Sequence, residues 1–486
     1  MFAALSSNQG GIHITRYRCD ICTVYEYDTE RGDSVTNIRP HTKPEDFPDD
    51  WACPICNSKK TELKRIDTAF EHPDASDIRS YLGIWRRKSD DTEAAMELIH
   101  RISETRESIS EPMRSKKYVP SWDDIFILGA QLAKIPVNSS EDVVTRTVIG
   151  PGAKVPLVID TPVFITHMSF GALSREMKIV LAQGSAAVKT AIGSGEGGIL
   201  IEERQAAYKY IFEYVPNRYS VSDENLRAVD AVEIKIGQSA KPGMGGEVPA
   251  EKATPEIAAI RGFPEGTDII SPARFDDIRN GKELREKVEW LREKSGGKPI
   301  GIKLAAGKIE ADLQVAVGAG PDFITIDGRP GGTAAANKMI KDSTSVPTIF
   351  ALHRARKYLD ENNAGRISLV ITGGLRISSD FAKAIAMGAD AVAIGTAAMM
   401  ATACQQYRLC NTDKCPVGVT THNPELRERL KIRISTRKLE NFLKVSTEEL
   451  KSFARLAGYT NVHDLCIEDL CTINSEISGH TDIRHA

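Results

Sequence analysis

Long apolar runs are missing from this chain of 486 residues. A membrane-spanning helix needs about 18 consecutive apolar residues, and no stretch approaches that length. Charge of one sign is also scarce, because 63 basic residues nearly balance 66 acidic ones and leave a formal net charge of −3. A surface that binds nucleic acid needs a clear basic excess. We therefore expect a protein that binds neither membrane nor nucleic acid.

Two further absences concern targeting and cofactor use. Residues 1–16 lack the apolar core of a secretory signal, so we expect a cytoplasmic location, and residues 1–15 are expected to be disordered. No dinucleotide-binding domain is indicated, so NAD(P)H would have to act through a partner chain. In a reducing compartment, nine cysteines favour metal binding over disulfides. Seven of them fall in tight clusters, and Cys466 and Cys471 are expected to be structural or inert.

Four of the clustered cysteines form two Cys-x-x-Cys pairs, Cys19 with Cys22 and Cys53 with Cys56. Each tight turn would hold two sulfurs on one side of a metal, which makes a tetrahedral four-thiolate site for Zn or a single Fe. The segment between the pairs is aromatic rather than aliphatic. A unit of about fifty residues with so small a core would need the metal in order to fold.

This segment resembles rubredoxin through Tyr17-Arg-Cys19, Tyr25-Glu-Tyr27-Asp28 and Phe47-Pro-Asp-Asp-Trp51-Ala-Cys53. The resemblance implies one iron on the four cysteines that passes single electrons, with structural zinc as the alternative. Thr23 and Asn57 stand where that family usually has glycine after the second cysteine of each pair, a change expected to shift the potential or slightly distort the site. We expect this domain to span residues 16–66 and a helical linker to follow over residues 67–122.

Residues 123–437 alternate apolar strand candidates with helical segments. Eight such runs over about 250 residues predict a parallel (β/α)8 barrel, with an open doubly wound sheet as the alternative. In a barrel, catalytic groups lie at the carboxyl ends of the strands. Residues 438–486 are expected to form a helical cap, with helices at 441–453 and 462–473. The eight candidate strands are 162–165, 187–192, 232–236, 268–270, 300–304, 323–326, 368–371 and 391–394.

The ends of the last strands carry features of a phosphate site. Gly373-Gly374 after the seventh and Gly395-Thr396 after the eighth would expose backbone N–H groups that can cradle a phosphate. Lys303 lies within the fifth strand and would point into the barrel mouth, where a buried ammonium needs an anionic partner. A reduced flavin carries negative charge near N1. The pattern therefore predicts FMN, with a core carboxylate paired to Lys303 as the alternative.

Three further cysteines, Cys404, Cys410 and Cys415, follow the last strand within twelve residues, and Pro416 comes next. Soft thiolates at this spacing fit an iron–sulfur cluster better than zinc or a disulfide. The alternative is that they are small buried side chains, the usual state of free cysteine.

The barrel and the three cysteines resemble the flavin-binding synthase domain of glutamate synthase, over about residues 120–475. The resemblance is carried by Met168-Ser-Phe-Gly-Ala-Leu-Ser174, Gly195-Glu-Gly-Gly198, Ala240-Lys-Pro-Gly243, Gly331-Gly-Thr333, Ile371-Thr-Gly-Gly374 and Cys404-x5-Cys410-x4-Cys415-Pro-Val-Gly-Val419. It implies that the three cysteines ligate a 3Fe–4S cluster beside FMN. It also implies cofactor contacts from Met168, Ser169, Gly171, Lys303, Gly328, Gly373, Gly374, Gly395 and Thr396.

The same resemblance implies where the substrate binds. Held over the flavin, 2-oxoglutarate would contact Ser169 or Ser174, Glu196 and Lys241, with Lys303, Lys241 and Glu196 as the catalytic residues. Glu247 departs from the family, because it stands where the family has a glutamine that contacts the substrate. A carboxylate there weakens the case for a dicarboxylate substrate.

We expect the N-terminal glutaminase domain of that family to be absent, because position 2 is Phe and no cysteine nucleophile stands at the start of this sequence. The nitrogen donor would therefore be glutamine through a partner subunit, free ammonia or an amine. The expected activity is FMN-dependent reductive amination of 2-oxoglutarate, through 2-iminoglutarate, to L-glutamate. Electrons would come from a ferredoxin or an NAD(P)H-linked flavin subunit. The alternatives are a subunit of N-methylglutamate synthase, which uses methylamine, or an electron-transfer subunit without its own synthase turnover.

Overall fold

The computed structural model describes residues 15–66, 81, 85, 87 and 89–486. The prediction of disorder for residues 1–15 lies outside the described residues, except at Thr15. Much of the predicted linker before residue 89 also lies outside them. The chain divides into two compact units, Met1–Glu107 and Ser108–Ala486, and each is considered by itself.

A three-stranded antiparallel sheet forms the first unit, in the order β2-β1-β3. Its aromatic core is small: the rings of Tyr27 and Phe47 meet edge to face, with centroids 4.8 Å apart, and Trp51 packs beside them. The helix expected in the linker is α2, which ends where Arg106 takes a left-handed conformation (φ 56°). The elements of this unit are β1 (Arg16–Cys19), β2 (Glu26–Asp28), η1 (Pro44–Asp46), η2 (Lys60–Glu62), β3 (Leu63–Ile66) and α2 (Met96–Thr105).

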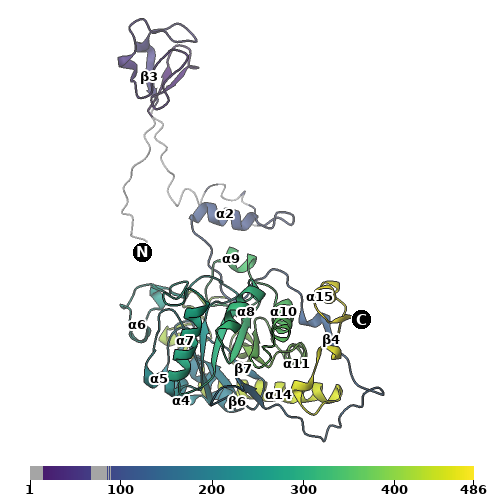
Figure 1. Cartoon of the computed structure of the whole chain (residues 1–486). Helices are drawn as coiled ribbons and strands as arrows, with labels where there is room; N and C mark the ends of the chain where they lie inside the picture. The colour runs from purple at the N-terminus through teal and green to yellow at the C-terminus, as the bar shows by residue number, and fades with distance from the viewer. Residues whose placement is uncertain (1–14, 67–80, 82–84, 86, 88) are drawn as a thin grey trace. The chain divides into compact units, whose positions relative to one another are not determined.

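The second unit is built on a closed barrel of eight parallel strands, ordered β10-β13-β14-β15-β16-β7-β8-β9 around the ring. This confirms the (β/α)8 prediction. Strands such as Ile-Thr-Ile within β14 are buried on both faces, as expected when helices cover a parallel sheet (Figure 1). The barrel strands are β7 (Val163–Ile165), β8 (Ala191–Gly193), β9 (Lys209–Tyr214), β10 (Ala231–Lys235), β13 (Ile300–Ala305), β14 (Phe323–Asp327), β15 (Ser368–Thr372) and β16 (Ala391–Ile394).

One of the eight predicted strands was wrong. Residues Ile269–Ile270 form β12, which pairs antiparallel with β11 (Glu247–Val248) in a hairpin outside the barrel. The third barrel strand is instead β9. The sequence of β9, Lys-Tyr-Ile-Phe-Glu-Tyr, is not uniformly apolar, because Glu213 lies against Lys303 at the barrel mouth. A search for apolar runs therefore missed this strand.

Helices surround the barrel, and the 25-residue α14 (Ile432–Leu456) packs along α3 (Arg175–Ala186). Gly184 lets the two helices approach, since a Cβ there would lie 2.6 Å from Leu439 Cδ2. The remaining helices of four or more residues are α4 (Ile201–Ala206), α5 (Asp223–Ala228), α6 (Pro255–Arg261), α7 (Gly281–Lys294), α8 (Ile309–Gly318), α9 (Lys338–Ser343), α10 (Thr348–Glu361), α11 (Ser378–Ala386), α12 (Thr396–Thr402), α13 (Pro424–Arg427) and α15 (Ser475–His480).

The C-terminal segment is less helical than predicted. Residues 462–473 hold the short turns η6 (Val462–Asp464) and η7 (Ile467–Asp469) and the strand β17 (Leu470–Thr472). β17 lies between β4 (Ile125–Ile127) and β18 (Arg484–His485), so pairing with a distant strand decided its conformation. A hairpin of β5 (Thr147–Ile149) and β6 (Leu157–Ile159) completes the unit. In the described part of the chain, no helix is both long and apolar enough to cross a bilayer.

Candidate active site and metal centres

The four N-terminal cysteines converge on one point. Their sulfur atoms all lie within 4.8 Å of one another, and the Cys19–Cys56 and Cys22–Cys53 pairs are 3.7 and 3.9 Å apart. A tetrahedral ion with metal–sulfur bonds of about 2.3 Å separates its sulfurs by about 3.8 Å. The donor set therefore fits a single four-thiolate ion, and these separations suit iron and zinc equally.

The two residues that replace glycine in this site have the conformation that glycine would favour. Thr23 and Asn57 are left-handed, with φ of 56° and 57°, and their N–H groups donate to the carbonyl oxygens of Cys19 and Cys53 at 2.9 and 2.8 Å. Asn tolerates this conformation, whereas a β-branched residue is strained by it. The substitution thus stores strain at Thr23 and leaves the turn geometry intact.

One cavity lies at the carboxyl end of the barrel, and residues at or just beyond the end of every barrel strand line it. This is where a (β/α)8 barrel places its chemistry. The cavity brings together most of the predicted site residues: Met168, Ser169, Gly171, Glu196, Lys241, Glu247, Lys303, Gly373, Gly374, Gly395, Thr396, Cys404, Cys410 and Cys415.

Two of the predicted site residues, Gly328 and Ser174, do not line the cavity. A Cβ on Gly328 would be 2.5 Å from Thr348 Oγ1, so Gly328 serves close packing at the start of α10. Ser174 caps α3: its Oγ accepts a hydrogen bond from Met177 N (3.2 Å) and donates one to Gly418 O (2.6 Å). Of the two serines considered for the substrate, Ser169 is the one that lines the cavity.

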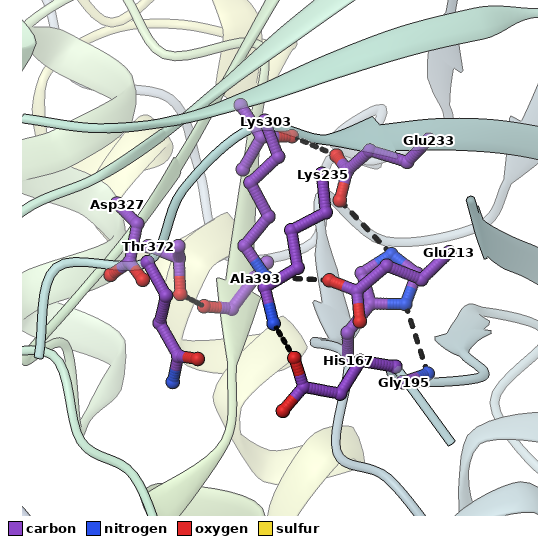
Figure 2. Close-up of polar contacts among 12 residues, drawn as sticks. His167, Gly195, Glu213, Glu233, Lys235, Lys303, Asp327, Thr372 and Ala393 are labelled. Carbon is purple, nitrogen blue, oxygen red and sulfur yellow. Dashed lines mark hydrogen bonds and ion pairs between the residues drawn. The ribbon is translucent and has the colours of Figure 1, made fainter. Parts of the chain in front are cut away.

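Lys303 points into the barrel mouth as predicted, and it has a carboxylate partner. Its Nζ lies 3.2 Å from Glu213 Oε1, and both side chains are almost fully buried (Figure 2). Burial raises the pKa of Glu213, but the positive charges around it, Lys303 first and Lys235 among them, together outweigh that effect and lower the pKa to about 2. The pair is therefore ionised. Lys303 has a core carboxylate as its partner, which is the alternative that the sequence analysis left open.

His167 is a site residue that the sequence analysis missed. Gly195 N donates to its Nδ1 at 3.2 Å, so the proton of a neutral ring sits on Nε2, which donates to Glu233 Oε2 at 3.0 Å (Figure 2). The hydroxyl of Thr325 also donates to Glu233. No spacing motif marks these residues, because they come from three different strands or their ends.

A second cluster of charges surrounds Glu196, beside the hairpin β11–β12. Lys241 Nζ lies 3.3 Å from Glu196 Oε1, and Lys235 is paired with Glu196 Oε2. Burial raises the pKa of Glu196, but Lys235 and Lys241 together hold it well below its ordinary value. Arg261 adds a further positive charge: it donates to Phe170 O at 2.7 Å, and its buried Nε has no hydrogen-bond partner among the residues that the structure describes.

This cluster carries more positive than negative charge. Three cations interact with Glu196. Glu213 also acts on the two lysines of this cluster, but it is already paired with Lys303, so the site has capacity for further carboxylate groups. Sequence reasoning found Glu196 and Lys241 but missed Lys235 and Arg261, which no glycine-rich motif marks. Gly246 permits the arrangement, since a Cβ there would lie 2.5 Å from Glu196 Oε1.

The opposite side of the cavity fits a phosphate. Gly373 and Gly374 have φ of 108° and 94°, and a Cβ on Gly374 would clash with Pro330 at 2.6 Å. Arg376, also missed from sequence, follows them, and its only hydrogen bond within the described chain from the guanidinium goes to Leu375 O. Burial and the nearby charge of Arg114 lower the pKa of Arg376 to about 10. A guanidinium with no carboxylate partner among the described residues suits an anionic phosphate.

The three C-terminal cysteines line the same cavity, and Cys410 and Cys415 are buried. Among the described residues they do not form a set of ligand atoms within 4.8 Å of one another, as the N-terminal four do. One ion would not span the trio, whereas a polynuclear cluster places its thiolates farther apart. The buried hydroxyl of Thr420, beside this loop, interacts with the thiols of Cys410 and Cys415 and has no other partner among the described residues. The donor set fits an iron–sulfur cluster.

A segment that we call the strap, residues 109–117, lies against the site. Met113 of the strap is buried and left-handed (φ 67°); its Sδ lies 3.6 Å from Cys410 Sγ, and its N donates to Thr333 O at 2.7 Å. The fully buried Lys341 secures the strap through Glu111 Oε2 (2.7 Å) and the carbonyl oxygens of Glu111 and Pro112 (3.0 and 3.3 Å). Backbone strain that its surroundings enforce is common at functional sites.

Comparison with known proteins identifies relatives of both units. The family model for the conserved region in glutamate synthase matches residues 92–460, and the rubredoxin model matches residues 16–63. A glutamate synthase large subunit-like protein of Rhizobium meliloti is 36% identical over 389 residues, which cover 76% of this chain and 88% of that protein. Archaeal-type glutamate synthase (NADPH) of Thermotoga maritima is 37% identical over 362 residues, covering 74% and 69%.

An archaeal glutamate synthase (NADPH) of Methanocaldococcus jannaschii is also 37% identical, over 364 residues that cover 74% of this chain and 70% of that protein. Both resemblances expected from the sequence are confirmed. The chain belongs to the glutamate synthase family, as an oxidoreductase of that type that carries an N-terminal rubredoxin domain.

Proposed function

We propose that this chain catalyses the reductive amination of 2-oxoglutarate, through 2-iminoglutarate, to L-glutamate. The observation that carries the proposal is the excess of positive charge around Glu196, at the cavity shared by the three cysteines. A 2-oxo dicarboxylate supplies two carboxylates and a carbonyl oxygen, which are acceptors for Lys235, Lys241 and Arg261. The relatives that bear the name glutamate synthase support the same reaction.

In this proposal Lys241 binds a substrate carboxylate and Glu196 positions Lys241. Burial lowers the pKa of Lys241, although Glu196 acts in the opposite direction. Entry of a carboxylate would restore the balance of charge around the ammonium. Ser169 and Gly171, in the loop after β7, would complete the contacts to the substrate and cofactor.

FMN would be held by the loop that begins at Met168, by Gly373 and Gly374, by Arg376 at its phosphate, and by Gly395 and Thr396. When bound, it would supply the electron pair that reduces the imine carbon. Lys303 would lie beside the ring while Glu213 keeps it charged.

The two sets of cysteines would carry single electrons to the site. Cys404, Cys410 and Cys415 would hold a 3Fe–4S cluster, and the four N-terminal cysteines one iron, with zinc as the alternative. We propose that the domain at residues 16–66 is a tethered electron inlet, because linkage raises the local concentration of a donor. The barrel would span residues 123–437 and its cap 438–486. A partner chain would deliver electrons from NADPH or a ferredoxin.

Glu247 favours a cationic nitrogen donor. It is exposed, on β11, and lines the rim of the cavity close to the lysine cluster. A carboxylate at the rim attracts ammonium or methylammonium and opposes a further anion. The second candidate function, N-methylglutamate formation from methylamine, rests on this residue.

The test is an anaerobic steady-state assay of the full chain with 2-oxoglutarate and a one-electron donor. Ammonium, methylammonium, and glutamine with a glutaminase partner are compared as nitrogen sources. We expect Lys241→Met to raise KM for 2-oxoglutarate at least tenfold. The control is Lys189→Met, since Lys189 is exposed and pairs with Asp160.

Cys19→Ser should abolish iron binding at the first site and slow electron entry while leaving FMN content unchanged. Protein that contains FMN yet forms no amino acid with any nitrogen source would contradict the proposal. That result would favour an electron-transfer subunit.

A further inference from the structure

Lys252 is a buried lysine beside the three-cysteine loop to which the proposed reaction assigns no role. It ends the short turn η5 (Ala250–Lys252), just after β11, and only 3% of it is exposed. Its Nζ donates to Cys410 O at 3.0 Å, to Thr420 O at 3.1 Å and to Ala172 O at 3.5 Å. The amine thus joins the middle of the cysteine loop, and the segment just after that loop, to the loop that follows β7.

Lys252 differs in its counter-charge from most of the other buried lysines of the barrel; the other exception among the described residues is Lys383, which donates to Trp122 O at 2.8 Å. Lys178, Lys303 and Lys341 each have a carboxylate oxygen within 3.2 Å. For Lys252, no carboxylate oxygen in the described part of the chain lies within ion-pair distance, and its hydrogen-bond partners are neutral carbonyls. Asp413 attracts it from farther away, while Asp413 Oδ1 accepts a hydrogen bond from His422 N at 2.7 Å.

A buried ammonium without a nearby anion is costly. The thiols of Cys410 and Cys415 interact electrostatically with Lys252, as do the carboxylate of Asp413 and the guanidinium of Arg261. The buried hydroxyl of Thr420, whose carbonyl Lys252 binds, interacts with the thiols of Cys410 and Cys415 and has no other partner in the described part of the chain. Thiolates with inorganic sulfide would supply the missing negative charge at this place.

We propose that Lys252 is the counter-charge of the cluster held by Cys404, Cys410 and Cys415, and that it raises the reduction potential of that cluster. The inference rests on the proposed function, because it requires the cluster. Reduction adds one electron to a group that is already anionic, and a fixed cation in a buried site stabilises the reduced form more than the oxidised form. Lys252 is a positioning residue in this scheme, because its side-chain amine binds backbone carbonyls of Cys410 and Thr420 and not the thiols themselves.

The test compares three substitutions in the anaerobically purified full chain. Lys252→Met removes the charge and the hydrogen bonds, Lys252→Gln removes the charge but keeps an N–H donor, and Lys252→Arg keeps the charge. Midpoint potentials are measured by redox titration followed by EPR, with iron and acid-labile sulfide as the measure of cluster content. The matched control is Lys414→Met, because Lys414 is an exposed cation within the same loop and solvent screens it.

We expect the equilibrium constant for reduction to fall at least tenfold in Lys252→Met and Lys252→Gln, which is a decrease of about 59 mV for one electron. Lys252→Arg and Lys414→Met should stay close to the unsubstituted protein. Loss of the cluster in Lys252→Met and Lys252→Gln, with retention in Lys252→Arg, would also support the proposal.

Equal potentials in all variants, or equal loss of cluster including Lys252→Arg, would overturn it, because shape rather than charge would then matter at this position. Absence of an iron–sulfur signal from the unsubstituted protein would instead reject the proposed function. The two failures are therefore distinguishable.

Discussion

At the scale of single residues, the strained backbone at Thr23 gives a direct prediction. Thr23→Gly should stabilise the N-terminal unit by about 1 kcal/mol, because glycine enters the left-handed region without the penalty that a β-branched residue meets. The measurement is the guanidinium midpoint at which the four-thiolate absorbance of the full chain is lost. Thr61→Gly is the control, since Thr61 is exposed and not left-handed. Equal destabilisation by both substitutions would disprove the role of strain.

His422 makes stability depend on pH. Its buried Nε2–H donates to Gly171 O at 2.9 Å, and burial lowers the pKa of this histidine to about 4. Between pH 6.5 and 4 the unfolded chain binds a proton that the folded chain does not. The contribution of His422 to stability is therefore complete above pH 6.5 and is lost as pH falls through 4, by at most about 1.4 kcal/mol per pH unit.

The measurement is the free energy of unfolding of the natural chain and of His422→Gln at pH 7 and pH 4.5. Gln keeps an N–H donor for the Gly171 carbonyl but does not titrate, so the gap between the two proteins should narrow or reverse at the lower pH. A gap that is the same at both pH values would contradict the prediction.

At the scale of elements, the strap depends on one lysine of α9. Lys341→Met removes the amine that binds the side chain and carbonyl of Glu111, so the strap should open more often. We expect amide hydrogen exchange at Glu111 and Met113 to become at least tenfold faster. Lys282→Met is the control, because Lys282 is exposed and pairs with Glu286 on its own helix, α7. Unchanged exchange in Lys341→Met would show that backbone hydrogen bonds alone hold the strap.

At the scale of the whole molecule, the two units should unfold separately. The N-terminal unit has a small aromatic core completed by its cysteines, whereas the barrel has a large core of its own. Calorimetry of the full chain should show two transitions, and Cys53→Ala should remove the one that belongs to the first unit. The barrel transition should stay within about 2 °C of its original temperature. Cys471→Ala, in β17, is the control; a joint shift of both transitions would mean that the units are coupled.

The sequence by itself determined the features that depend on local spacing. Two Cys-x-x-Cys turns place four sulfurs around one point, because each turn fixes its own pair. Gly373-Gly374 at the end of β15 and Gly395-Thr396 at the end of β16 mark the cavity, since the carboxyl ends of parallel strands meet at one face. Apolar runs buried on both sides found seven of the eight barrel strands, whereas β9 was missed because Glu213 interrupts its apolar pattern.

Only the tertiary structure decided which charges meet. Lys303 pairs with Glu213, ninety positions away, and Lys235 and Arg261 join Glu196 from separate elements. The partners of Lys252 are backbone carbonyls, which every residue carries and which therefore leave no trace in a sequence. Burial turns such contacts into strong constraints, because a charge removed from water must find its partners within the fold.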